Sequence, residues 1–516
     1  MMLCQRITKR LLLLSIFISL TILYAQSDQD PLTGLDTYIQ EAMTQWELPG
    51  LAIAVVNDDR VVYARGFGVR ELGRPELVDE HSLFAIASHT KAFTATAVGM
   101  LVHEDRFAWD DRVVDLFPSF QLYDPFATRE MTVRDLLTHR QGYNTWAGDL
   151  MWWASDLSRQ EVIRHLRYLE PDFSFRSRYG YNNMMYITAG ELIPHLTGTS
   201  WDDFVTTRLL RPLGMNRTTT TIRELDQLGN IAMPHTKVED QIITIPYRNV
   251  DNCGPAASLN SSAWDMAQWL RLQLAYGSRN GAQLVDSSVI RETRIPQTPI
   301  RISASYQQRF PSTHFLAYGL GWNLQDYKGR LVMRHGGGMD GMLSYTILIP
   351  EANMGVTVLT NSDAQSLYFA LAWYVVDAFL GGDRKDWSSI YLARAEEEER
   401  KDTADRLERE NSRAKKSKPT LPLKDYTGIY RSEYYGTADI VREKGRLALS
   451  LQHHPGVQGQ LEHWQYDTFN CDWGQPTWGE SLVTFTINAD GEVTALAFKV
   501  REDFIDPNEY VFKRIP

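Results

Sequence analysis

Hydrophobic side chains recur at two different spacings in the first part of the chain. From residue 36 to residue 46 the apolar positions lie three or four apart, which predicts a helix that ends before Pro49-Gly50. The runs LAIAVVN and VVYARGFGV then lie on either side of a polar turn at residues 57–59. Their content of β-branched and aromatic residues predicts a β-hairpin.

Three further β-like runs lie between residues 330 and 361. They read RLVMRH, SYTILIP and GVTVLTN, and glycine-rich or proline-containing turns separate them. The apolar run SLYFALAWYVVDAFLGG follows and has the character of a helix. We therefore expect one large α/β (α+β) domain, whose two ends share an antiparallel sheet and whose helical middle is inserted between them.

A charged segment and a second β-rich region follow. Residues 394–418 are almost purely charged, with opposite charges four apart such as Glu396 and Arg400, which favours a solvated helical linker over a binding tail. Beyond Pro422, the short alternating runs ADIVRE, RLALSL, LVTFTI and VTALAFKV are typical of a small all-β domain, most simply a barrel. The expected boundaries are 33–384 for the large domain, 385–422 for the linker and 423–516 for the β domain.

The first 25 residues have the layout of a secretory signal peptide. Arg6, Lys9 and Arg10 precede an apolar run that ends at Ala25, and this run is shorter than the ~18 residues that a spanning helix needs. An uncleaved anchor is the alternative interpretation. The sequence thus predicts a secreted or periplasmic protein without stable membrane insertion after cleavage of residues 1–25.

Composition and charge limit the possible partners. Of the 516 residues, 43% are hydrophobic, which is typical of a globular protein. The net charge of −11 argues against binding to nucleic acid, because that binding depends on clustered positive charge. Only Cys253 and Cys471 lie beyond the signal-like segment; an oxidising compartment permits their pairing, but two cysteines so far apart are more often independent. We expect a small-molecule or peptide substrate, and self-association is possible.

The stretch FAIASHTKAFTATAV places Ser88 and Lys91 three residues apart at the start of an apolar helix. One helix face carries both side chains, the helix N-terminus favours negative charge at Ser88, and apolar surroundings lower the pKa of the lysine amine. These are the conditions for an activated serine nucleophile. Ser412 and Lys415 have the same spacing within the charged segment, where a solvated surface pair is expected.

The order of three motifs resembles the penicillin-recognising serine hydrolases, which include class C β-lactamases, D,D-peptidases, D-aminopeptidases and related esterases. FAIASHTKAFTATAV is similar to the nucleophile helix of that family, MTVRDLLTHRQGY to its T-x-x-x-L-L-T-H segment, and GPAASLNSSAWDMAQWL to its P-A-G-G-L-x-S-x-x-D-L-A segment. The resemblance extends through most of residues 35–380 and implies a β-lactamase/transpeptidase-like fold. The C-terminal β domain resembles the lipocalin-like appendage of some of these hydrolases, which implies a cover for the active site or a surface for self-association.

The family's second motif, Y-x-N, is present as Tyr181, Asn182 and Asn183. The resemblance implies that Tyr181 is the general base that removes the proton from Ser88 and returns it to the leaving group. It also implies that Asn183 orients Lys91 and the substrate amide. A surface turn with aromatic packing is the alternative interpretation of these residues.

The run HGGGMDG contains G-x-G-x-x-G but is not expected to bind a dinucleotide, because a strand and not a helix follows it. The resemblance identifies His335-Gly336-Gly337 as the third motif, H-x-G, on an edge strand beside the active site. It implies that Gly337 permits a close backbone approach, that the N–H groups of Ser88 and Gly338 form an oxyanion hole, and that His335 binds Tyr181 or a substrate carboxylate. His335 replaces a lysine of many relatives and is only partly charged near neutral pH, which argues against efficient β-lactamase activity.

Three features complete the prediction. Trp146, Trp152 and Trp153 precede the Y-x-N motif and either form an apolar rim for the substrate or belong to the core. His453-His454 has no neighbouring ligands at metal spacing, so a solvated turn is expected there, and no metal or organic cofactor is predicted.

The leading hypothesis is an exported serine hydrolase that cleaves amide bonds of peptides, possibly with D-residues, through an acyl-enzyme at Ser88. A carboxylesterase or weak β-lactamase of the same family is the first alternative. A non-catalytic protein that binds peptidoglycan fragments is the second.

Overall fold

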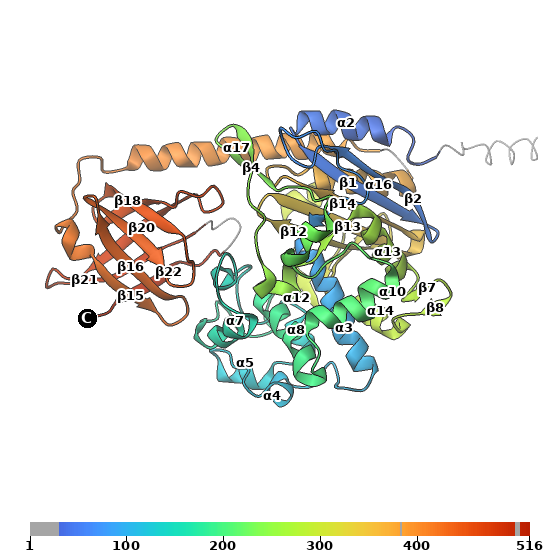
Figure 1. Ribbon diagram of the computed structural model, residues 1–516, viewed down its shortest axis with the longest axis horizontal. Coiled ribbons are helices and arrows are strands. Elements are labelled where there is room, and N and C mark those ends of the chain that lie inside the picture. Colours follow the sequence, from blue (N-terminus) through green and yellow to red (C-terminus); the bar gives the residue numbers. More distant parts are fainter. Residues whose placement is uncertain (1–29, 382–383, 501–505) are drawn as a thin grey trace, which may run out of the picture.

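The computed structural model describes residues 30–381, 384–500 and 506–516. The predicted signal peptide, residues 1–25, lies outside the described residues. Figure 1 shows two bodies: a large domain built on a twisted sheet, and a barrel that the long helix α17 connects to it. The predicted combination of an α/β domain with an antiparallel sheet and a small all-β barrel is confirmed.

The sheet of the large domain has eight strands in the order β2-β1-β14-β13-β12-β11-β10-β9. The two ends of the large domain meet where β1 pairs antiparallel with β14, with Val55 opposite Val356, as the β-rich runs predicted. The strands are β1 (Gly50–Asn57), β2 (Arg60–Gly68), β9 (Thr298–Ile300), β10 (Leu316–Tyr318), β11 (Asn323–Tyr327), β12 (Arg330–Met339), β13 (Met342–Ile349) and β14 (Met354–Thr360).

Each face of the sheet buries a separate hydrophobic cluster because alternate side chains of a strand point to opposite faces. On one face Leu51, Ile53 and Val55 pack with α2 (Leu35–Gln45) and α16 (Leu367–Leu380). On the other face Ala52, Ala54 and Val56 belong to the cluster that includes the helical region. That region contains α3 (Thr90–His103), α7 (Arg159–His165), α8 (Asn183–Thr197), α12 (Gly254–Ala257), α13 (Ala263–Leu274) and α14 (Ser287–Thr293).

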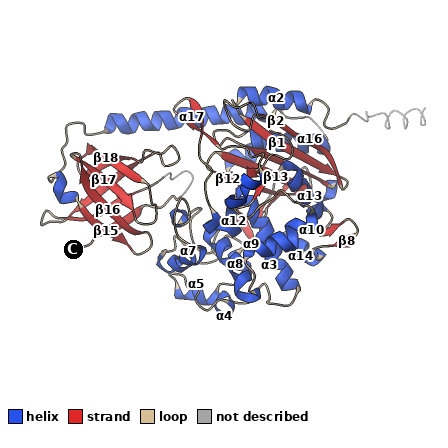
Figure 2. Ribbon diagram, in the orientation of Figure 1, coloured by secondary structure: helices blue, strands red, loops and turns tan. Residues whose placement is uncertain are grey.

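The charged segment forms most of helix α17 (Trp387–Ser412). Arg394 and Glu398 pair at 2.7 Å across one turn, and the predicted pair of Glu396 and Arg400 lies at 3.9 Å. Figure 2 shows this single helix running from the sheet domain to the strands of the barrel. None of the described helices is both long and apolar enough to cross a membrane.

The C-terminal domain is a closed barrel in which each strand pairs with the next and the last pairs with the first. Cys471 is buried in this barrel and Cys253 is buried in the large domain, and both are free thiols. The strands are β15 (Gly428–Ser432), β16 (Gly436–Glu443), β17 (Arg446–Leu451), β18 (Gln458–Gln465), β19 (Thr468–Asp472), β20 (Glu480–Ile487), β21 (Val493–Phe498) and β22 (Tyr510–Arg514).

The prediction of a solvated turn at His453-His454 is wrong. His454 is buried, and its Nε2 lies 3.1 Å from the carbonyl oxygens of both Leu150 and Trp153 in the large domain. The backbone N–H of Asp156 donates to the carbonyl of His453 at 3.0 Å. The turn is therefore part of the contact between the two domains, which a local polar pattern does not reveal.

Candidate active site

Ser88 lies in a short 3-10 turn, Ala87–His89, that leads directly into α3. Every residue from Ser82 to Leu101 is buried except Ser88 itself, which is partly exposed. Ala87 has a φ of 47°, a left-handed conformation that is unfavourable for a residue with a Cβ atom. The fold thus presents this one hydroxyl from an otherwise buried helix start.

Lys91 lies on the first turn of α3 and is fully enclosed. Its Nζ lies 3.0 Å from Ser88 Oγ, 2.6 Å from Asn183 Oδ1 and 3.0 Å from the carbonyl oxygen of Ala256. Burial lowers the pKa of this amine to about 7, although nearby Cys253 and Asp149 oppose the shift. The amine is therefore substantially neutral at physiological pH.

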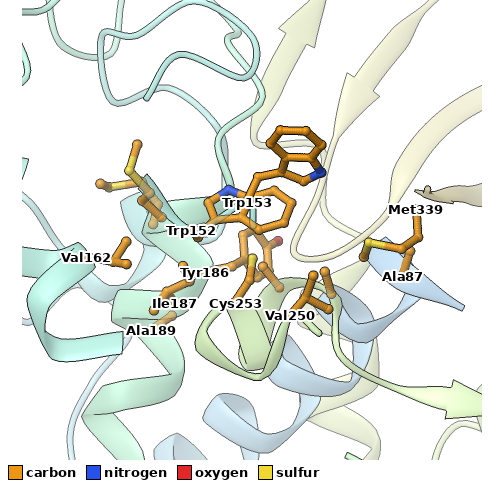
Figure 3. Close-up of a cluster of buried hydrophobic side chains, with 14 of the residues drawn as sticks. Ala87, Trp152, Trp153, Val162, Tyr186, Ile187, Ala189, Val250, Cys253 and Met339 are labelled. Carbon is orange, nitrogen blue, oxygen red and sulfur yellow. The ribbon is translucent and has the colours of Figure 1, made fainter. Parts of the chain in front are cut away.

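Lys91 lies beside the large buried hydrophobic cluster, since its Nζ is 5.5 Å from the ring centre of Tyr186. Figure 3 shows Ala87, Tyr186 and Cys253 within it, together with Trp152 and Val250. These apolar side chains exclude the water that would otherwise stabilise the charged form of the amine.

Tyr181 and Asn183 reach the same point from the start of α8. Asn182 caps this helix, because its side chain accepts from the N–H of Met185 at 3.2 Å. The Tyr181 ring centre lies 4.7 Å from Lys91 Nζ, and its hydroxyl hydrogen-bonds Ser88. Desolvation raises the pKa of Tyr181 well above its ordinary value, so the phenol is protonated at neutral pH.

Strand β12 forms the opposite wall, and its three glycines have different surroundings. A Cβ atom on Gly337 would lie 2.1 Å from the carbonyl oxygen of Ile86, so the close approach of β12 to the serine turn requires glycine. β12 is an interior strand, whereas an edge strand was predicted. In the described sheet, however, its pairing with β11 ends at Arg334, so residues 335–339 pair only with β13.

His335 is buried at the start of this half-free stretch. Its Nδ1 donates to the Gly336 carbonyl at 2.7 Å, so its Nε2 accepts from the Tyr318 hydroxyl at 3.1 Å. Burial, followed by the charge of Lys91, lowers the pKa of His335 well below its ordinary value. The imidazole is therefore neutral and bonded to Tyr318, where the sequence predicted partial charge and a bond to Tyr181 or to substrate.

Two polar residues at the site were not predicted. Asp149 is buried, and its Oδ2 accepts from Asn183 Nδ2 at 2.6 Å, while burial raises its pKa well above the ordinary range. His139 lies with its ring centre 4.3 Å from that of Tyr181 and 4.4 Å from that of Tyr318. His139 belongs to the LLTH segment and so was within reach of motif reasoning, but nothing in the spacing of Asp149 marks it.

One cavity of about 320 Å³ joins these groups. Of the tryptophans predicted as a rim, Trp146 and Trp152 line it, whereas Trp153 packs against Trp478 of the barrel with ring centres 4.8 Å apart. None of the described lining residues is lysine or arginine. They are Ser88, Thr145, Trp146, Asp149, Trp152, Tyr179, Tyr181, Asn183, Ala257, Asn323, His335, Gly336 and Gly338.

The arrangement suits acyl transfer at a serine. Among the described residues, no group of three or more His, Cys, Asp or Glu side chains could hold a metal ion. The second serine–lysine pair behaves as a surface pair: Ser412 Oγ donates to the Arg409 carbonyl at 3.0 Å, and Lys415 lies 3.9 Å from Glu410.

Two family models match the chain. The model described as Beta-lactamase matches residues 35–380, and the model described as a domain of unknown function (DUF3471) matches residues 412–514. The lipocalin-like resemblance of the barrel thus stays a prediction.

The chain is 29% identical over 463 residues to the unguisins hydrolase ungD of Aspergillus violaceofuscus, across 80% of this chain and 77% of that protein. It is 26% identical over 332 residues to penicillin-binding protein 4 of Amycolatopsis lactamdurans, across 63% of this chain and 84% of that protein. Among solved structures, the octameric penicillin-binding protein homologue from Pyrococcus abyssi aligns with a TM-score of 0.61 and 22% identity, across 93% of this chain and 100% of the other. SurE with D-Leu aligns with a TM-score of 0.53 and 18% identity, across 94% and 99%. The structural likeness shows the shared fold.

Proposed function

The chain belongs to the Beta-lactamase family, whose model spans residues 35–380, and from this premise we propose that it hydrolyses amide bonds of peptides through an acyl-enzyme at Ser88. As a family member with a relative named as a hydrolase, it is a serine hydrolase. The observation that carries the proposal is the 3.0 Å contact between the partly exposed Ser88 hydroxyl and a buried lysine amine.

The neutral amine of Lys91 has the right contacts for a general base. Its two N–H groups donate to Asn183 Oδ1 and to the Ala256 carbonyl, which leaves its lone pair for the Ser88 hydroxyl. Tyr181 is a weaker candidate for the base than the sequence resemblance implied, because desolvation keeps its phenol protonated. We therefore assign proton abstraction to Lys91 and proton relay to Tyr181.

The proposed reaction follows from these positions. Lys91 takes the proton as Ser88 Oγ attacks the amide carbon, and the N–H groups of Ser88 and Gly338 stabilise the oxyanion. The proton passes through Tyr181 to the leaving amine as the C–N bond breaks. A water molecule, deprotonated by the same groups, then attacks the acyl-enzyme, which releases the acid and restores Ser88.

The cavity favours an uncharged part of a peptide over a terminal carboxylate. Its described lining contains no lysine or arginine, and His335 is neutral, so a substrate carboxylate would be buried without a cation. The half-free edge of β12 at residues 335–339 can pair with an extended peptide backbone. Trp146 and Trp152 supply an apolar wall for an adjacent side chain. A small ester also fits these features, whereas the carboxylate of a β-lactam does not.

The proposal also includes export to the periplasm or the exterior, and the signal-like residues 1–25 support it.

An enzyme and a protein that only binds cell-wall fragments differ in one requirement: only the enzyme needs a group that removes the serine proton. The enclosed Lys91 supports hydrolysis.

The decisive experiment compares Ser88→Ala with Ser412→Ala, the serine of the surface pair. We expect a fluorophosphonate to label the parent and Ser412→Ala equally and to leave Ser88→Ala unlabelled. Turnover of internal peptide amides, D-amino amides, D-alanyl peptides, short esters and nitrocefin by the parent then identifies the substrate class. Equal labelling of Ser88→Ala would contradict the acyl-enzyme, and reversible fragment binding without turnover would favour the binding protein.

A further inference from the structure

The barrel holds both backbone groups of Gly148, a residue of the large domain. Asp506 Oδ2 accepts from the Gly148 N–H at 2.7 Å, and the Tyr434 hydroxyl donates to the Gly148 carbonyl at 3.0 Å. Gly148 has a φ of 84°, and a Cβ atom there would lie 2.3 Å from the Tyr434 hydroxyl oxygen. The two domains therefore meet at this glycine without space for any side chain.

The same segment of the large domain is held at three further backbone groups. His454 lies within 3.1 Å of the carbonyl oxygens of Leu150 and Trp153, and the Asp156 N–H donates to the His453 carbonyl at 3.0 Å. Tyr434 also contacts α7, since its carbonyl lies 2.7 Å from His165 Nδ1. These contacts fix residues 148–156, which we call the barrel-held segment, along most of its length.

The barrel-held segment carries Asp149, and Asp149 leads to the nucleophile. Asp149 Oδ2 accepts from Asn183 Nδ2 at 2.6 Å, and Asn183 Oδ1 accepts from Lys91 Nζ at 2.6 Å. Lys91 in turn lies 3.0 Å from Ser88 Oγ. The side-chain amide of Asn183 is hydrogen-bonded to Asp149 through its nitrogen and to Lys91 through its oxygen. A displacement of Asp149 therefore changes the position at which this amide holds the lysine amine.

We propose that the barrel contributes to the active site, because its residues Tyr434 and Asp506 position the catalytic lysine. The connection from the barrel to this lysine runs through Gly148, Asp149 and Asn183. The described barrel residues do not line the cavity, so the barrel acts on the chemistry through the barrel-held segment and not by contact with substrate. The inference rests on the proposed function, because it assigns a positioning role in that same reaction.

The test is Tyr434→Phe in the full chain, with Tyr430→Phe as the matched control. Both tyrosines are buried in the barrel and donate to a backbone carbonyl, but Tyr430 donates to Tyr426 within the barrel, at 2.7 Å. We expect Tyr434→Phe to lower kcat for a small activated ester about tenfold with KM within about twofold. Asp506→Ala is expected to act in the same direction, and Tyr430→Phe to leave both constants unchanged.

A double-mutant cycle separates positioning from general loosening. In an Asp149→Ala background, Tyr434→Phe is expected to change kcat by less than about twofold, because the connection to Lys91 is already broken. Equal kinetics of Tyr434→Phe and Tyr430→Phe, or additive effects of Tyr434→Phe and Asp149→Ala, would overturn the inference. Either result leaves the serine chemistry intact, whereas activity in Ser88→Ala would remove the proposed function itself.

Discussion

Lys91 is the residue whose environment decides how the proposed reaction depends on pH. Burial lowers its pKa to about 7, so the base form predominates above that pH and is lost below it. We expect kcat/KM to rise with pH and to level off above a midpoint near 7.

Replacing Lys91 with Arg, which stays charged, is expected to lower kcat by ~10³ or more.

Asp149 is the control for this pH profile, because burial moves its pKa upward from the carboxyl range. The ascending limb should persist in Asp149→Asn at a reduced rate, since the limb belongs to the lysine. Loss of the limb in that variant would assign the titration to Asp149 instead. A flat kcat/KM from pH 5 to pH 9 in the parent would exclude a neutral lysine as the base.

Residues differ in how far their surroundings can be predicted from sequence. Ser88 and Lys91 could be paired because a helix brings positions three apart to one face, and the structure places them 3.0 Å apart. Asp149 could not be predicted, because its contact with Asn183 depends on how residues far from the nucleophile helix fold onto it. The neutral state of His335 could not be predicted for the same reason, since it is burial by distant segments, followed by the charge of Lys91, that lowers the pKa of this side chain.

At the scale of elements, the approach of strand β12 to the serine turn depends on one glycine. A methyl group on Gly337 would meet the Ile86 carbonyl at 2.1 Å, whereas one on Gly336 would have its nearest atom, in Tyr345, at 3.6 Å. We expect Gly337→Ala to cost ~1–3 kcal/mol of unfolding free energy and to abolish most activity, because it moves β12 away from Ser88.

Gly336→Ala is the matched change on the other face of the same strand. It should leave the stability in thermal unfolding near the parental value, because the added methyl group makes only ordinary contacts. Full activity of Gly337→Ala would mean that β12 can shift without disturbing the serine.

Most elements of the large domain could be predicted from the sequence. The hairpin of β1 and β2 and the sheet shared by the two ends of this domain follow from the period and length of the apolar runs. The point at which β12 stops pairing with β11, at Arg334, does not.

At the scale of the whole molecule, the contact between the domains was beyond sequence reasoning. A pair such as His453-His454 looks like a polar turn because nothing local shows that another domain covers it. The structure buries His454 against Leu150 and Trp153, and its ring meets that of Trp478 edge to face, with ring centres 5.2 Å apart. The predicted barrel was confirmed as an element of the fold, while its attachment became visible only in three dimensions.

This attachment makes the joint between the domains sensitive to acid. The Nε2–H of neutral His454 donates to the two carbonyl groups, while its Nδ1 is buried without a partner among the described residues, so protonation places a second N–H where nothing accepts it. Burial lowers the pKa of His454 to about 4 from an ordinary value of 6.5. The unfolded chain therefore binds this proton more readily, and the stabilisation present above pH 6.5 is lost as the pH falls toward 4.

We expect the parent to lose up to ~3 kcal/mol of unfolding free energy through this group between pH 6.5 and pH 4. His454→Gln should be less stable at neutral pH and should lose less stability over that interval, as measured by thermal unfolding. His463→Gln, in the same barrel with its ring nitrogen 3.0 Å from the Tyr466 carbonyl, should follow the parent curve. If His454→Gln and the parent lose stability in parallel, the acid sensitivity lies in other buried groups and the domain joint withstands protonation. If the difference in unfolding free energy between the parent and His454→Gln instead becomes smaller in acid, His454 is the residue whose protonation weakens the contact between the barrel and the barrel-held segment.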